Sequence, residues 1–203
     1  MAFVKRVQEA GGAVYVVGGW VRDWLRGVSP KDKDYVVVGV TAKKFTALFS
    51  KAQCVGRSFP VFLLQIGDTS VEIALARREK KKGTGYRGFS VEADGNVTIE
   101  EDLFRRDTTM NSMAMELPAG TLIDPYGGQK DIAHRLIRAV SPHFTEDPVR
   151  ALRAARQAAT FGFSVASETI LSMTACREEL CREPGERILE ELTRALSAPR
   201  PSI

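Results

Sequence analysis

The chain has 203 residues, of which 44% are hydrophobic and 27% are charged, so it can bury a core and suits one domain with a smaller second one. This composition excludes a disordered or fibrous protein. The net charge of +4 permits a phosphate-rich partner without requiring one, because the basic residues are spread along the chain.

The first part of the chain predicts a mixed sheet with helices. Strand-like runs rich in β-branched residues occur at Val14–Val17, Tyr35–Val38, Phe62–Ile66, Val71–Ala76 and Met113–Glu116. Helical patterns cover Ala42–Ser50 and Leu103–Asn111. The basic, glycine-punctuated run Arg77–Gly85 and the residues after it, to Phe89, predict a mobile loop.

The pattern changes after Val140, where strand alternation ends. Three helices are predicted, over Glu146–Phe161, Ser167–Cys181 and Pro184–Ser197. We therefore expect an α+β fold with a domain over residues 1–140 and an all-helical domain over residues 141–203.

The cysteines and the hydropathy pattern bear on location. Cys54, Cys176 and Cys181 lack zinc-site spacing and are typical of reduced thiols. No signal-peptide pattern is present, and no segment approaches the ~20 apolar residues that span a bilayer. The sequence predicts a cytoplasmic protein with no membrane role.

A glycine pair and an acidic pair form the strongest functional signal. Gly18 and Gly19 allow a sharp turn into a helix that opens near Trp20, and free N–H groups at a helix start favour an anion. Asp32 and Asp34 are two residues apart, so on a strand both carboxylates face one side and can hold cations jointly. Each feature alone is typical of an ordinary turn. Within one short βαβ window they favour a phosphate cradle beside a metal site.

Glu72 adds a third carboxylate. It faces the opposite side of its predicted strand from Ile73, and it could reach the two aspartates from a neighbouring strand. Three acids suit phosphoryl-type transfer with two Mg²⁺ ions, one activating the attacking hydroxyl and one holding a triphosphate. A solvent-facing residue on a half-exposed strand explains Glu72 equally well.

Basic residues gather in two later segments. Arg105 and Arg106 offer planar forks for phosphate oxygens, although a solvated helix face also explains them. The helix predicted over 146–161 carries charged residues at every third position: Asp147, Arg150, Arg153 and Arg156. Leu152, Ala155 and Ala159 lie opposite this row and are expected to face a core. Periodicity alone puts Arg150 on a solvated face and Arg156 at the margin of the apolar stripe, where it needs a partner.

Seven segments, in order, carry a family resemblance: Val17–Gly27, Lys31–Asp34, Glu72–Arg77, Gly85–Phe89, Glu101–Asp107, Ile123–Gly128 and Glu146–Arg156. They resemble the class II tRNA nucleotidyltransferases, or CCA-adding enzymes, and the related bacterial poly(A) polymerases, over nearly the whole chain. The resemblance implies a polymerase-β-like nucleotidyltransferase head, a mixed sheet flanked by helices, followed by a helical neck.

The resemblance also implies roles for individual residues. Asp32 and Asp34 are expected to bind two Mg²⁺ ions and, with Glu72, to be catalytic. The expected nucleotide-binding residues are Gly18, Gly19, Arg22, Arg106, Asn111, Asp147, Arg150, Arg153 and Arg156. In this family Asp147 and Arg150 occupy the positions that read the base edge in place of a template.

The implied reaction joins CMP and AMP, from CTP and ATP, to the 3′ end of tRNA and releases pyrophosphate. Poly(A) addition and partial addition, A-only or CC-only, remain alternatives, because they use the same catalytic residues. A nucleotide-binding module without catalysis is a further alternative. An RNA-binding structural protein is disfavoured, because the acids would repel RNA phosphate unless metals intervene.

Two features depart from the family pattern. Residues 108–113 replace the usual Phe or Leu and the later Asn-Ala-Leu, a mild change in packing near a hinge. Family members continue through body and tail helices that hold tRNA, whereas this chain stops at Ile203, so we expect it to be an N-terminal fragment.

Overall fold

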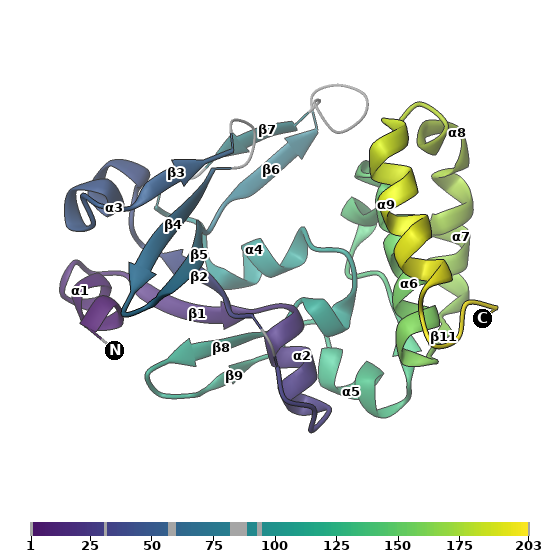
Figure 1. Cartoon of the computed structure of the whole chain (residues 1–203), viewed down its shortest axis with the longest axis horizontal. Coiled ribbons are helices and arrows are strands. Elements are labelled where there is room, and N and C mark those ends of the chain that lie inside the picture. Colours follow the sequence, from purple (N-terminus) through teal and green to yellow (C-terminus); the bar gives the residue numbers. More distant parts are fainter. Residues whose placement is uncertain (1, 31, 57–59, 82–88, 93–94, 203) are drawn as a thin grey trace. The chain divides into compact units, whose positions relative to one another are not determined.

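The computed structural model describes residues 2–30, 32–56, 60–81, 89–92 and 95–202 (Figure 1). The chain packs into two compact units that alternate along the sequence. Unit 1 comprises Met1–Lys80, Ser90–Leu103 and Met113–Pro125, and unit 2 comprises Lys81–Phe89, Phe104–Ser112 and Tyr126–Ile203. No helix in the described residues is long and apolar enough to cross a membrane.

Unit 1 is built on a seven-stranded sheet with the order β3-β4-β5-β2-β1-β8-β9. Its strands are β1 (Ala13–Val17), β2 (Asp34–Val38), β3 (Gln53–Val55), β4 (Val61–Ile66), β5 (Thr69–Leu75), β8 (Ala114–Leu117) and β9 (Leu122–Ile123). The β2–β5 pair is parallel and the other pairs are antiparallel. The sheet is therefore mixed, as the sequence predicted.

The central strands form because they are rich in valine and tyrosine. Val14, Val16 and Val17 of β1 and Val36 and Val37 of β2 are almost completely buried. Such β-branched side chains pack well on a pleated surface with both faces covered. The core thus holds β1, which ends just before Gly18 and Gly19, and β2, which begins at Asp34.

Four helices accompany this sheet: α1 (Ala2–Glu9), α2 (Gly19–Leu25), α3 (Ala42–Leu48) and α4 (Ile99–Phe104). Thr41 caps α3 by accepting a hydrogen bond from the Lys44 N–H at 3.3 Å. The Phe45 ring packs against Phe49 and Phe62, with centroids 4.9 and 4.7 Å away. These aromatic contacts fix α3 against the sheet.

Unit 2 is mainly helical. Its elements are the short 3₁₀ helices η2 (Thr109–Asn111) and η3 (Pro142–Glu146), the helices α5 (Gly128–Ala133), α6 (Val149–Phe161), α7 (Ser167–Ala175), α8 (Arg177–Leu180) and α9 (Gly185–Leu196), and the strands β10 (Leu136–Ile137) and β11 (Ser164–Val165). Buried Met110, Ile137, Phe144, Ala154 and Ala158 form its core together with Phe163. This core joins the segment around η2 to α6.

The helix predicted over Leu103–Asn111 is wrong. The α4 helix ends at Phe104, and η2 begins only at Thr109. Asp107 accepts a hydrogen bond from the N–H of Thr108 at 2.7 Å, and Thr108 is extended and bridges to Ala139. A side chain that bonds its own backbone in this way competes with helix formation.

The all-helical prediction for the last part needs one correction, since β11 pairs in parallel with β10. A strand of two residues is too short to show the alternation of apolar and polar residues by which strands are predicted. Arg78–Lys81 form strand β6, which pairs with β7 (Phe89–Glu92), so this part of the basic run is not a loop. Residues 82–88 lie outside the described residues, and the mobility of the loop stays a prediction.

The division into residues 1–140 and 141–203 also stays a prediction about functional domains. The compact units cross that boundary, because residues 104–112 and 126–140 pack with the helices that follow them.

Candidate active site

The glycine turn joins β1 to α2, as the sequence predicted. Gly18 has φ 70° and ψ −131°, a conformation that essentially only glycine adopts easily. Its N–H donates to the Met113 carbonyl at 3.2 Å, which ties the turn to the residue before β8. A Cβ on Gly19 would lie 3.3 Å from Nη2 of Arg22, so the missing side chain leaves room for that guanidinium.

Arg22 is fixed beside this turn by Asp23. Its Nε and Nη2 donate to Oδ1 and Oδ2 of Asp23 at 2.9 and 2.7 Å, and Arg26 Nη1 donates to Oδ1 at 3.0 Å. Burial acts to raise the pKa of Asp23, but the hydrogen bonds and charges of the two arginines outweigh it and hold the pKa below its ordinary value. The carboxylate therefore stays ionised and orients Arg22.

Two of the three predicted acidic residues lie opposite each other near the centre of the sheet. Asp34 begins β2 and lies directly opposite Glu72 in the parallel β2–β5 register. Neighbouring strands are about 4.8 Å apart, and opposed residues share a face. Asp32 precedes the strand by two residues, so the expected strand carries only one of the two aspartates. All three side chains are exposed.

These carboxylates suit a hard divalent cation. Among the described residues, no group of three or more His, Cys, Asp or Glu is gathered closely enough to hold a metal ion. Carboxylate oxygens from Asp32, Asp34 and Glu72 are nevertheless the ligands that Mg²⁺ prefers. The ammonium of Lys33, between the two aspartates in sequence, lies 4.8 Å from the centroid of the Trp20 ring.

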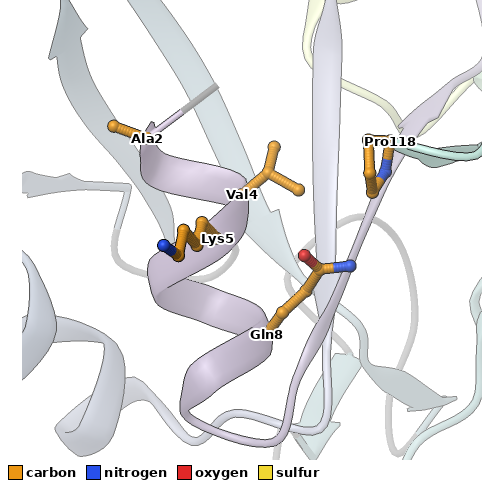
Figure 2. A pocket seen from close by; sticks show the side chains of 5 residues that line it. All are labelled: Ala2, Val4, Lys5, Gln8 and Pro118. Carbon is orange, nitrogen blue, oxygen red and sulfur yellow. The ribbon is translucent and has the colours of Figure 1, made fainter.

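A pocket elsewhere in unit 1 contains none of the predicted site residues. Figure 2 shows that it lies beside α1, with Pro118 on its other side. Its lining is Ala2, Val4, Lys5, Gln8 and Pro118. This lining offers one cation, Lys5, and one amide, Gln8.

Unit 2 holds a buried carboxylate that sequence reasoning did not single out. Asp107 is 6% exposed, and its Oδ2 accepts from Arg153 Nε at 3.0 Å and from Gln157 Nε2 at 3.2 Å. Its Oδ1 accepts from the predicted site residue Asn111, through Nδ2, at 3.2 Å. Burial raises the pKa of Asp107, but the Arg153 charge, the hydrogen bonds from the Thr108 N–H and from Asn111, and the Arg150 charge overcome it and lower the pKa to about 2.

The charged residues predicted to form one row on α6 have different surroundings in the structure. Arg150 is 9% exposed rather than solvated, and its Nη1 donates to the carbonyls of His143 and Arg106 at 2.9 and 3.4 Å. The solvated-face interpretation of Arg150 is therefore wrong, because its guanidinium satisfies carbonyls of two preceding segments. Arg156 does have the partner it needed, since its Nε donates to Glu191 Oε2 at 2.6 Å.

The buried side of α6 also differs from the predicted one. Leu152 and Ala155 are only half-buried, whereas Ala151, Ala154 and Ala158 are buried. The buried face of α6 is therefore shifted by one residue from the predicted one, and it takes in Arg150, which the periodicity placed on the solvated face. Ala159 is buried as expected.

Asp147 lies between η3 and α6 rather than on the helix. Its Oδ1 and Oδ2 both accept from Nη2 of Arg187, at 3.2 and 2.9 Å. Its carbonyl accepts from the Arg150 N–H at 3.0 Å, so the two residues are adjacent at the helix start. Sequence reasoning missed Arg187 and Glu191, although Glu183, Arg187 and Glu191 recur at every fourth position, the spacing of one helix face.

Comparison with known proteins adds the family. The family model described as the poly A polymerase head domain matches residues 14–138. The chain belongs to this poly A polymerase head-domain family. A second family model, described as a probable RNA and SrmB-binding site of polymerase A, matches residues 162–203.

Relatives of this head-domain protein are much longer. A multifunctional CCA protein of Haemophilus ducreyi is 48% identical over 196 residues, which cover 94% of this chain and 46% of the relative. The chain thus spans about half the length of the curated relatives it matches.

Two solved structures have the same fold. The Bacillus stearothermophilus CCA-adding enzyme in complex with CTP aligns with a TM-score of 0.82 and 29% identity, over 98% of this chain and 48% of that one. The Thermotoga maritima CCA-adding enzyme complexed with tRNA aligns with a TM-score of 0.74 and 31% identity, over 98% and 47%.

Proposed function

We propose that this chain is the catalytic and base-selecting part of a nucleotidyltransferase that adds CMP and AMP, from CTP and ATP, to the 3′ end of tRNA. The observation that supports it most directly is the parallel register that sets Asp34 against Glu72, with Asp32 two residues upstream. Membership of the head-domain family and likeness to CCA-adding enzymes support it further. A cytoplasmic location stays a prediction from the sequence.

In this proposal the head carries the transfer. Asp32 and Asp34 would hold two Mg²⁺ ions, which when bound supply activation of the tRNA 3′-hydroxyl and offset the triphosphate charge. Glu72 would support the two aspartates from β5. The Gly18–Gly19 turn allows phosphate oxygens to approach the backbone, and Arg22, oriented by Asp23, offers N–H groups to them.

Base selection without a template would use the neck. Cytosine and adenine present an exocyclic amino donor beside a ring-nitrogen acceptor, whereas uracil and guanine present a carbonyl acceptor at the matching position. Asp147 supplies an acceptor and Arg150 a donor, and Arg153 and Arg156 supply positive charge nearby on α6. The Nη1 bonds to the Arg106 and His143 carbonyls hold the Arg150 guanidinium in place at the start of α6.

Poly(A) addition is the second candidate, favoured by the description of the matching head-domain model. Both candidates are tested by offering CTP, ATP, UTP and GTP separately, and CTP together with ATP, to tRNA that lacks its terminal nucleotides. CCA addition predicts CTP use first and ATP use only after two CMP additions, whereas poly(A) addition predicts long products from ATP alone. Product from ATP alone would overturn the CCA assignment.

Variants of the acidic pair test the catalytic assignment in the same assay. Asp32→Ala or Asp34→Ala should abolish transfer and leave the circular dichroism spectrum unchanged, because each removes a ligand and neither side chain is buried. Either variant working at the parental rate at ordinary Mg²⁺ would refute the assignment. A parent chain that binds nucleotide but transfers none would instead indicate a binding module.

A further inference from the structure

The α9 helix carries a row of charged residues that faces α6. Glu183, just before the helix, and Arg187 and Glu191 within it, are spaced four apart and lie on one side. Both acids are nearly buried, at 7% and 6% exposure. The two helices lie alongside each other in unit 2, α6 in green and α9 in yellow (Figure 1).

Each member of this row bonds a residue assigned to base selection or that residue's partner. Glu191 accepts from Arg156 Nε at 2.6 Å and lies 3.5 Å from Arg153 Nη1. Arg187 places Nη2 on Asp147, and its Nη1 donates to Glu183 Oε2 at 2.6 Å. Arg187 therefore holds Asp147 with one nitrogen, Nη2, while Glu183 holds Arg187 through the other, Nη1.

The hydrogen bonds of Asp147 leave a defined acceptor. An ionised carboxylate has about four lone-pair sites. Oδ1 accepts from the Val149 N–H at 3.3 Å and from Arg187 at 3.2 Å, and Oδ2 accepts from Arg187 at 2.9 Å. Among the described residues, the remaining acceptor site thus belongs to Oδ2.

We infer that Arg187 is a specificity-positioning residue, which fixes the Asp147 carboxylate so that Oδ2 accepts the exocyclic amino group of an incoming cytosine or adenine. The inference rests on the proposed function and extends it to a residue that need not contact the nucleotide. A fixed Oδ2 meets the donor of C or A and repels the carbonyl oxygen of U or G. A carboxylate free to rotate turns away from that carbonyl oxygen, so discrimination falls.

Electrostatics agree with this arrangement. Burial acts to lower the pKa of Arg187, but the hydrogen bonds and charges of Asp147 and then Glu183 outweigh it and raise the pKa above its ordinary value. Arg187 therefore remains a cation throughout the working pH range. Its side chain is 25% exposed and that of Asp147 is 16% exposed, so the pair is only partly screened by water.

The test measures binding of UTP and CTP to the full chain, with Mg²⁺, by equilibrium dialysis. We expect Arg187→Gln to lower the ratio of the UTP to the CTP dissociation constant about tenfold, the worth of one well-placed polar contact. Arg187→Lys keeps a cation that can bond both carboxylate oxygens and should stay within about twofold of the parent. Arg194→Gln is the matched control, because Arg194 lies on the same helix and pairs only at the surface with Glu190.

A double variant separates positioning from a merely structural role. If Arg187 acts through Asp147, Asp147→Ala combined with Arg187→Gln should show the same ratio as Asp147→Ala alone, whereas independent effects would add. If Arg187→Gln does not fold, Glu183→Gln replaces it, since it keeps both charges of the pair and loosens Arg187. A smaller fall in the ratio is then expected.

The outcomes distinguish this inference from the proposed function. The inference is overturned if folded Arg187→Gln keeps the parental ratio of the UTP to the CTP dissociation constant. The same holds for Glu183→Gln where it replaces that variant. Base selection by Asp147 stands in either case. A parent chain that binds UTP as tightly as CTP would overturn the base selection in the proposed function, and the inference with it.

Discussion

Asp107 offers the sharpest test of how unit 2 is held together. Replacing it by Asn keeps the shape of the side chain and removes the charge that binds Arg153. The amide also presents an NH₂ group where the carboxylate accepted hydrogen bonds from Gln157 and Asn111. We therefore expect Asp107→Asn to destabilise unit 2 strongly although the substitution is nearly isosteric.

The magnitude follows from the titration of the carboxyl. Its pKa falls from 3.8 to about 2 on folding, and each pH unit corresponds to about 1.4 kcal/mol, so the charged form is favoured by about 2 kcal/mol. In the variant, the NH₂ group of the new Asn faces an NH₂ group of Gln157 or Asn111, and this adds about 1 kcal/mol to the loss of stability. Loss of its partner costs Arg153 less, because that side chain is 41% exposed and reaches water.

The pH dependence gives an independent measure of the same contribution. Because the folded pKa is lowered, the stabilisation is fully present above the unfolded value of 3.8 and is lost as the pH falls from there towards 2. The parent should lose about 2 kcal/mol of unfolding free energy through Asp107 over this window. Asp107→Asn should lack that part of the acid sensitivity.

Urea unfolding followed by far-ultraviolet circular dichroism is the suitable assay. Circular dichroism reports the helices of unit 2 directly, whereas Trp20 and Trp24 both belong to unit 1. Asp68→Asn, at an exposed turn residue, is the control and should change stability by less than about 0.5 kcal/mol. A loss below about 1 kcal/mol in Asp107→Asn at pH 7 would refute the ion-pair argument.

Three further outcomes are expected. Gly18→Ala should destabilise unit 1 by about 1–3 kcal/mol in thermal unfolding, since φ 70° with ψ −131° strains any residue with a Cβ; an unchanged melting temperature would contradict this. Asp147→Ala and Arg150→Ala should each raise use of UTP and GTP relative to CTP and ATP, and Arg150→Ala should also lower stability because two carbonyls lose their donor. Glu72→Ala should slow primer extension less than Asp34→Ala, and equal losses would show that the third acid is as important as the second.

Most of the features that build the predicted site of unit 1 follow from local residue patterns. Valine-rich β1 and β2 are visible as strands because burial on both faces requires apolar side chains at every position. The glycine turn, the start of α2 and the spacing of Asp32 and Asp34 all involve residues within a few positions of one another. Local backbone geometry governs such features, so a pattern of residue types predicts them.

The ion pairs of unit 2 depend on residues that are far apart in the sequence. Asp107 meets Arg153 and Gln157, which are 46 and 50 positions away, and Asp147 meets Arg187 at a separation of 40. Periodicity assigned Arg150 to water, because a charged side chain on the polar side of a helix normally stays there. Its burial depends on carbonyls that other segments bring to α6, and packing between distant elements, not local propensity, sets which charges are paired.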